Sequence, residues 1–278
     1  MDPDQGIDLS NWKGPNLADR HVRVALAQIP PAADVDGACA AAARGGAEIV
    51  VFPEMFSNGY IGFDANDPAA RQAWIDAAVS LDGPYVDRYR ILARNHGLAI
   101  VTTFLERGDP RPFSAAALID RRGDMILHQR KRHICFFEGP EEACAPGEGS
   151  RVARLQTGAG EIAIGIMICM DREYPDVASD LVAAGAEIVL IPNACPLVDD
   201  PEVGDVRVAG VRAMAFEGVI GMAVTNYPVP QHDGHSFGVD PLGKIIAMGG
   251  TDQEIVFVDF DIGAIRSLQE MEWFRRVR

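Results

Sequence analysis

Long apolar segments are missing from this sequence. No stretch of about 18 or more residues, the length that a membrane-spanning helix requires, is both free of charge and strongly apolar. The first residues, Met1-Asp2-Pro3-Asp4, contain neither the basic start nor the apolar stretch of a secretory signal peptide. We therefore expect a cytoplasmic protein.

Basic residues are also scarce. Lys and Arg number 25 against 40 Asp and Glu, so the formal net charge is −15 at pH 7. A negative surface of this kind repels phosphate groups, which argues against general binding to nucleic acid or to an anionic membrane.

Cysteine is sparse, and its number is odd. None of the five cysteines has the short paired spacing that is typical of a zinc site. Reduced thiols, no metal and no other cofactor are therefore expected. The five are Cys39, Cys135, Cys144, Cys169 and Cys195.

Apolar residues, in contrast, are plentiful enough for a sizeable core. Of the 278 residues, 48% are hydrophobic and 23% are charged. This composition is typical of a soluble enzyme, and we expect one domain over residues 21–278, preceded by an extended arm over residues 1–20.

One segment of the first half recurs in the second. Residues 46–53, GAEIVVFP, return almost unchanged as residues 185–192, GAEIVLIP. Each copy follows an Ala-rich helical stretch, and each helix follows an apolar strand. A strand–helix–strand unit used twice predicts parallel strands in each half, with helices covering them. The expected elements are strands 22–29 and 162–168, helices 35–44 and 174–184, and the two repeated strands.

The other elements follow from apolar periodicity and from turn residues. A turn at residues 121–124 opens a hairpin into the strand that carries Lys131. Helices are expected at 84–95 and 206–217, and strands at 98–105, 113–119, 219–226, 234–239, 244–248 and 255–259.

Cys169 comes directly after the strand 162–168 and before Met170-Asp171-Arg172-Glu173-Tyr174-Pro175. A thiol where a buried strand gives way to a helix can reach solvent while backbone N–H groups of the turn face the same space. This position suits a depressed thiol pKa and an oxyanion hole. The simpler interpretation is that Cys169 is the last core residue of its strand.

Two further segments favour a catalytic thiol. Glu54 directly follows the apolar run 50–53, which is a poor position for a surface charge. Lys131 lies in the segment 129–134, which taken alone is typical of a solvated basic cluster or a nucleic-acid patch.

Taken together, these residues resemble the nitrilase (carbon–nitrogen hydrolase) superfamily, whose site places Glu, Lys and Cys in this chain order. The resemblance extends from about His21 to the C-terminus. Gly218 departs from it, since the family usually has Asn after the preceding Glu. The segments that carry the resemblance are Phe52-Pro53-Glu54 with Gly59-Tyr60, Lys131-Arg132-His133, 168–175, Pro192-Asn193-Ala194 and 212–217.

The resemblance implies an α/β fold, a four-layer α-β-β-α sandwich built from the two strand–helix–strand halves. Cys169 would end the first strand of its half, and Glu54 the second strand of the other. The site would lie where the C-terminal edges of the two sheets meet.

The family also carries a second active-site Glu shortly before a Pro-Gly step, which here is Pro146-Gly147. The candidates are Glu138, Glu141 and Glu142, and the spacing to this step favours Glu141.

The resemblance implies a cysteine hydrolase that acts on non-peptide carbon–nitrogen bonds. Glu54 would accept the thiol proton as Cys169 attacks an amide or ureido carbon, and a thioester would form. Lys131 would favour the thiolate and, with the Met170 N–H, would hold the oxyanion, while burial would raise the pKa of Glu54. Tyr60 and Asn193 are further candidates for substrate binding.

Arg172 bears on the substrate. An Arg after Cys-x-Asp resembles the N-carbamoyl amino acid hydrolases, in which it meets a substrate carboxylate. The alternative is a salt bridge to Glu173 or Asp176. Small amides, N-carbamoyl compounds and nitriles all remain open as substrates.

Three other functions are alternatives to a Glu–Lys–Cys hydrolase. The motif at residues 234–238 fits the elbow of α/β-hydrolases, but a strand and turn, not a helix, are expected after Ser236, and no His follows His235. A Cys–His hydrolase would use His133 or His232 as its base. A non-catalytic binding protein is disfavoured because Glu54, Lys131 and Cys169 are all present.

The tail from Trp273 to Arg278 pairs aromatic residues with Arg. This suits docking on a partner subunit, and a homodimer or higher homo-oligomer is expected. A frayed basic helix end is the alternative.

Overall fold

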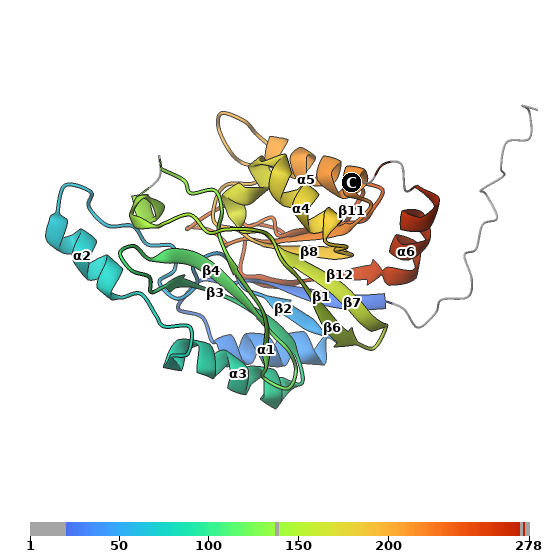
Figure 1. The fold of residues 1–278 in the computed structure, drawn as a ribbon, viewed down its shortest axis with the longest axis horizontal. Helices are drawn as coiled ribbons and strands as arrows, with labels where there is room; N and C mark the ends of the chain where they lie inside the picture. The colour runs from blue at the N-terminus through green and yellow to red at the C-terminus, as the bar shows by residue number, and fades with distance from the viewer. Residues whose placement is uncertain (1–20, 137–138, 273–274, 276–278) are drawn as a thin grey trace, which may run out of the picture.

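The computed structural model describes residues 21–136, 139–272 and 275. Within them the chain forms twelve β-strands in two sheets of six (Figure 1). The expected arm over residues 1–20 lies outside the described residues, as does the tail after Glu272 apart from Arg275.

The first sheet has the strand order β12-β1-β2-β3-β4-β5. Strands β1, β2 and β3 are parallel, whereas β4 is antiparallel to β3 and β5 is antiparallel to β4. Strands β2 and β5 therefore end at the same edge of the sheet. The bounds are β1 (His21–Gln28), β2 (Ile49–Val51), β3 (Ala99–Glu106), β4 (Phe113–Ile119), β5 (Met125–Arg130) and β12 (Glu254–Asp261).

The second sheet has the order β11-β10-β9-β8-β7-β6, with β7, β8 and β9 parallel. The parallel strands predicted for each half are thus confirmed. The bounds are β6 (Val152–Thr157), β7 (Gly160–Ile166), β8 (Ile188–Pro192), β9 (Gly221–Thr225), β10 (Phe237–Val239) and β11 (Ile245–Met248).

Alternation along each strand divides the core into layers. In β8, Ile188 and Leu190 belong to the cluster between the two sheets, whereas Val189 and Ile191 belong to the cluster under the helices. Strands buried on both faces need apolar residues at successive positions, as both GAEIV segments provide. Helices α1 (Val35–Arg44) and α3 (Pro84–His96) cover the first sheet, and α4 (Pro175–Ala183) and α5 (Val206–Gly218) cover the second (Figure 1). The α-β-β-α sandwich is confirmed.

Three elements were not predicted. Helix α2 (Pro68–Asp76) has no buried residue, so it shows no apolar stripe, although Asp67 caps its start. Strand β6 precedes β7, so Cys169 follows the second strand of its half, and the expectation that it ends the first was wrong. Helix α6 (Ile262–Met271) contributes Ile262 and Ile265 to the core between the sheets.

Strand β12 joins the sheet of the other half. It pairs along its whole length with β1, from His21↔Asp261 to Gln28↔Glu254. The last strand of the chain therefore lies beside the first, and this pairing joins the second half of the chain to the sheet of the first half. Among the described residues, none of the helices is long and apolar enough to cross a membrane.

The two sheets approach each other closely at Gly238. Its neighbours Phe237 and Val239 face the helices, so Gly238 faces the other sheet, where a Cβ would overlap Cγ1 of Val258 in β12. We expect Gly238→Ala to lower the free energy of unfolding by about 1–3 kcal/mol, as overpacking does. Urea unfolding measures this.

Gly210→Ala is the matched control, because a Cβ at Gly210 in α5 meets no atom within 4 Å. This exchange should raise stability by about 0.8–1 kcal/mol through helix propensity alone. Equal stability of Gly238→Ala and the wild type would contradict the close approach of the sheets at this point.

Candidate active site

A buried lysine lies between two buried carboxylates. The Nζ atom of Lys131 is 2.7 Å from Oε1 of Glu54 and 2.5 Å from Oε1 of Glu141. All three residues are fully buried (0% exposed). A charge this deep in a protein is stable only when it is paired.

The strand ends bring these groups together. Lys131 follows β5 directly, and its N–H donates to the Ser114 carbonyl at 2.8 Å. Glu54 follows β2 after Phe52-Pro53, and its backbone is held on both sides: its N–H donates to the Asn193 carbonyl at 3.3 Å, and the Tyr227 hydroxyl donates to its carbonyl at 2.9 Å. The acid is thus fixed by residues of the opposite sheet.

Glu141 lies on the short 3-10 helix η2 (Gly139–Ala143) and has no unused oxygen. The Tyr60 hydroxyl donates to its Oε1 at 2.6 Å, and the Cys135 N–H donates to its Oε2 at 3.0 Å. Glu142 contributes only its backbone carbonyl, to Arg111. Glu138 lies outside the described residues. Of the two described candidates, Glu141 is therefore the one that meets Lys131.

The two carboxylates differ in basicity. Burial and the neighbouring Cys169 raise the pKa of Glu54, and its Oε2 atom is buried without a hydrogen-bond partner among the described residues. Burial also acts on Glu141, but the charge of Lys131 and the bond from Tyr60 outweigh it and lower the pKa. Burial alone would lower the pKa of Lys131, yet the charges of Glu54 and Glu141 raise it, so the ammonium stays charged.

Cys169 begins the 3-10 helix η3 (Cys169–Glu173) with a left-handed backbone, φ 45°. A non-glycine residue in this region is strained, and such strain gathers at functional sites. The side chain is 3% exposed. Met170 follows in the first turn, where backbone N–H groups have no partner within the helix, so its N–H is a candidate donor for an oxyanion.

The resting thiol is not acidic. The neighbouring Cys195 and burial raise the pKa of Cys169, and the opposing effect of Lys131 is smaller. The depressed thiol pKa expected from the sequence was therefore wrong. The expectation considered the lysine but not the second sulfur beside Cys169.

Asp171 is a functional residue that sequence reasoning missed. Its carboxylate is fully buried and accepts three backbone N–H groups, those of Arg132 and His133 on Oδ1 and that of Ile168 on Oδ2, at 2.8–3.0 Å. It thereby ties the segment after Lys131 to the turn that carries Cys169. The signal was an Asp two residues after Cys169 at a helix start, a position where carboxylates cap backbone donors.

The Arg172 guanidinium is held by protein groups. Its Nη1 donates to the Cys169 carbonyl at 2.7 Å, and its Nη2 lies 3.2 Å from Oε1 of Glu173. The side chain is almost fully buried. Of the two alternative partners, Glu173 is the one observed, whereas Asp176 pairs with Arg132. This geometry favours a role in supporting the nucleophile turn.

Asn193 also turns inward. Its Nδ2 donates to Oδ1 of Asn226 at 3.0 Å and to the Cys195 carbonyl at 3.3 Å. Asn226, which follows β9, was not identified from the sequence. The two amides brace the loop between β8 and the site. The Asn193 side chain is therefore placed as a support behind Glu54.

The structure does not support the alternative nucleophile or the alternative bases. Ser236 is followed by strand β10, and its Oγ accepts the Asn226 N–H, so the hydrolase elbow is absent. The His133 ring stacks on Tyr174 at 3.7 Å. Burial lowers the pKa of His232 to about 4. In the described chain neither imidazole is hydrogen-bonded to Cys169.

One group of side chains in the described residues could bring three metal ligands together: Asp199, Asp233 and His235. The Asp233 carboxylate already accepts the N–H groups of residues 197, 198 and 199. Its position is explained by this loop contact without an ion.

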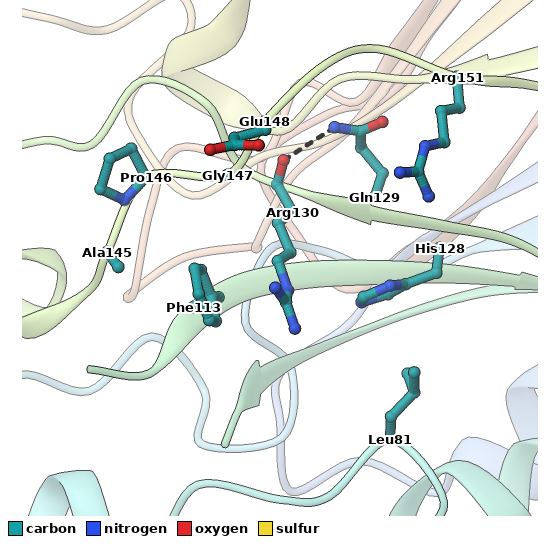
Figure 2. A pocket seen from close by; sticks show the side chains of 10 residues that line it. All are labelled: Leu81, Phe113, His128, Gln129, Arg130, Ala145, Pro146, Gly147, Glu148 and Arg151. Atoms are coloured by element: carbon teal, nitrogen blue, oxygen red, sulfur yellow. Dashed lines mark hydrogen bonds between the residues drawn. The ribbon is translucent and has the colours of Figure 1, made fainter. Parts of the chain in front are cut away.

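A cavity of about 560 Å³ lies beside β5 but does not contain the site. Figure 2 shows the side chains of His128 and Arg130 on one side of this strand and that of Gln129 on the other. Arg130 is paired with Glu106 at 2.6 Å. None of Glu54, Lys131 and Cys169 lines this cavity.

Comparison with known proteins points in one direction. A sequence profile described as Carbon-nitrogen hydrolase matches residues 23–270. The chain is 32% identical over 252 residues to the "Hydrolase in pqqF 5'region" of Pseudomonas protegens, covering 86% of this chain and 83% of that protein. It is 27% identical over 243 residues to the deaminated glutathione amidase of Homo sapiens, covering 82% and 71%.

Solved structures of amidases are also similar to this chain. A mutant amidase from Nesterenkonia sp. AN1 is described as showing covalent addition of the acetamide moiety of fluoroacetamide at the active-site cysteine. It superposes with a TM-score of 0.70 at 26% identity, over 94% of this chain and 97% of that one.

Glu141 and Glu142 form a matched pair for a test. We expect Glu141→Gln to lower kcat by about tenfold or more, because the amide cannot supply the second negative charge beside Lys131. Glu142→Gln should stay within about twofold of the wild type. Steady-state kinetics, with circular dichroism to confirm folding, measure both. The reverse pattern would assign the second carboxylate to Glu142.

Proposed function

The chain belongs to the carbon–nitrogen hydrolase family, and from this premise we propose that it hydrolyses small linear amides or N-carbamoyl compounds through a thioester on Cys169. The observation that carries the proposal is the convergence of a basic carboxylate, a charged lysine and a strained cysteine in one buried site. The acetamide moiety on the cysteine of the Nesterenkonia amidase supports a small acyl group.

In the first half of the reaction, the Cys169 sulfur attacks the carbonyl carbon while Glu54 accepts the thiol proton. Lys131 and the Met170 N–H stabilise the oxyanion that forms. Each such donor contributes about 2.7–4 kcal/mol in other hydrolases. Glu54 then gives its proton to the leaving nitrogen, the carbon–nitrogen bond breaks, and a thioester remains.

In the second half, Glu54 accepts a proton from water, and the resulting hydroxide attacks the thioester carbon. The carbon–sulfur bond breaks, the acid product leaves, and Cys169 recovers its proton from Glu54. The raised pKa of Glu54 serves both halves, because it brings the base closer to the thiol in proton affinity. Glu141 stays ionised throughout and keeps Lys131 charged.

Trapping of the intermediate tests this proposal. The protein is mixed with a library of amides, N-carbamoyl amino acids and nitriles, and products and peptide adducts are read by mass spectrometry. We expect acid and amine from at least one amide or carbamoyl compound, with a transient acyl group on the peptide that contains Cys169. Cys169→Ala should form neither product nor adduct.

Three outcomes would contradict the proposal. Activity of Cys169→Ala would show that Cys169 is not the nucleophile, and an acyl adduct at Ser236 would assign that role to Ser236. Products from nitriles alone would make the protein a nitrilase.

Arg172 provides a second prediction, on substrate charge. Because its fork holds the Cys169 carbonyl and Glu173, we expect Arg172→Lys to lower kcat/KM by a similar factor, about tenfold, for an N-carbamoyl amino acid and for its neutral amide. Arg132→Lys is the control, since Arg132 pairs with Asp176 and Asp180 outside the site. A rise in KM confined to the carboxylated substrate would instead show that Arg172 binds the substrate carboxylate.

A further inference from the structure

A second sulfur lies beside the nucleophile. Cys169 follows β7 and Cys195 follows β8, its parallel neighbour in the sheet, so the two strand ends deliver both thiols to one place. The Arg172 guanidinium contacts both: Nη2 is 3.1 Å from Sγ of Cys195, and Nη1 is 3.7 Å from Sγ of Cys169. The two thiols are close enough that each shifts the pKa of the other.

The surroundings favour the thiolate on Cys195. The neighbouring Cys169 lowers the pKa of Cys195 to about 6, and although burial opposes the shift, Arg172 and Arg207 add to it. Asn193 Nδ2, 3.6 Å from its sulfur, is a further donor. Of the two thiols, Cys195 is therefore the one on which a thiolate is favoured.

Cys195 is also the more accessible of the pair. It is the one cysteine of the five that is not buried. Thiolate character together with exposure determines which cysteine reacts with peroxide. A nearby thiol then determines whether the product becomes a disulfide or is oxidised further. Cys195 has both the thiolate character and the exposure, and Cys169 is the nearby thiol.

We propose that hydrogen peroxide converts Cys195 and Cys169 into a reversible disulfide that takes the nucleophile out of action. The Cys195 sulfur attacks one peroxide oxygen, the O–O bond breaks, and with one proton a water molecule leaves, so Cys195 becomes a sulfenic acid. The Cys169 sulfur then attacks the Cys195 sulfur, its proton passes to the departing hydroxide as water, and the S–S bond forms. Two thiols are oxidised and one peroxide is reduced.

The disulfide also protects Cys169. A cysteine alone in excess peroxide proceeds past the sulfenic acid to the sulfinic acid, which dithiols do not reduce. A disulfide stops that sequence and is opened by a dithiol through exchange. The inference rests on the proposed function only in that Cys169 is the nucleophile whose loss abolishes turnover.

The test compares wild type, Cys195→Ser and Cys39→Ala after excess hydrogen peroxide, with and without later dithiothreitol. Unreduced digests are read by mass spectrometry for a cross-linked peptide pair, lighter by two hydrogens, that contains Cys169 and Cys195. Cys39 is the control because it lies on α1, among the outer helices and away from the site. Hydrolysis of an amide is measured in parallel.

We expect the cross-link in the wild type and in Cys39→Ala, with activity reduced about tenfold or more and mostly restored by dithiothreitol. Cys195→Ser should form no cross-link and should lose activity more slowly than the wild type, because the remaining Cys169 is buried and its pKa is raised. Dithiothreitol should not restore the activity that this variant does lose. Sulfinic acid at Cys169 in the wild type, or loss and recovery of activity in Cys195→Ser equal to those of the wild type, would overturn the inference. The cross-link is detected without substrate, so a cross-linked protein that hydrolyses no amide would refute only the proposed function.

Discussion

The buried ammonium of Lys131 is the interaction on which the rest of the site depends. A lysine with no solvent contact needs carboxylates at hydrogen-bond distance, and removing one partner of such a buried pair typically costs about 3–5 kcal/mol. Its two partners come from distant segments, Glu54 after β2 and Glu141 on η2. The layered fold places these chain segments at one edge, and the ion pairs then hold them there.

The pairing with Lys131 gives the two glutamate carboxylates, Glu54 and Glu141, different proton affinities. Glu141 is saturated by Lys131, Tyr60 and the Cys135 N–H, so it remains an anion that keeps the lysine charged. Glu54 shares Lys131 through one oxygen only, and its other oxygen has no partner within the described part of the chain. An incompletely satisfied buried carboxylate has a raised pKa, which is what a general base for a thiol requires.

The sequence was sufficient for features that are local or repeated. The two GAEIV segments predicted the parallel strands, and Cys169 and Glu54 became candidates because each follows an apolar strand. Lys131 became a candidate only through the resemblance to the family, since its segment taken alone is typical of a basic cluster. Features that depend on residues distant in the sequence were not predicted. They are the pairing of β12 with β1, the contacts of the buried Asp171 carboxylate, and the effect of Cys195 on the pKa of Cys169. Helix α2 was not predicted because none of its residues is buried, so its sequence has no apolar periodicity.

The raised pKa of Cys169 determines the order of events in the proposed reaction. For an exposed thiol and carboxylate, with pKa values of about 8.5 and 4.3, proton transfer would cost about 6 kcal/mol. The raised pKa of Glu54 shrinks that difference, while burial and Cys195 act against a free thiolate. A standing thiolate is therefore disfavoured before substrate arrives. As the sulfur bonds to the carbonyl carbon, its negative charge passes to the oxygen, for which Lys131 and the Met170 N–H are the proposed donors. Proton transfer and attack thus become favourable together, because the charge moves from a buried sulfur to an oxygen that these donors bind.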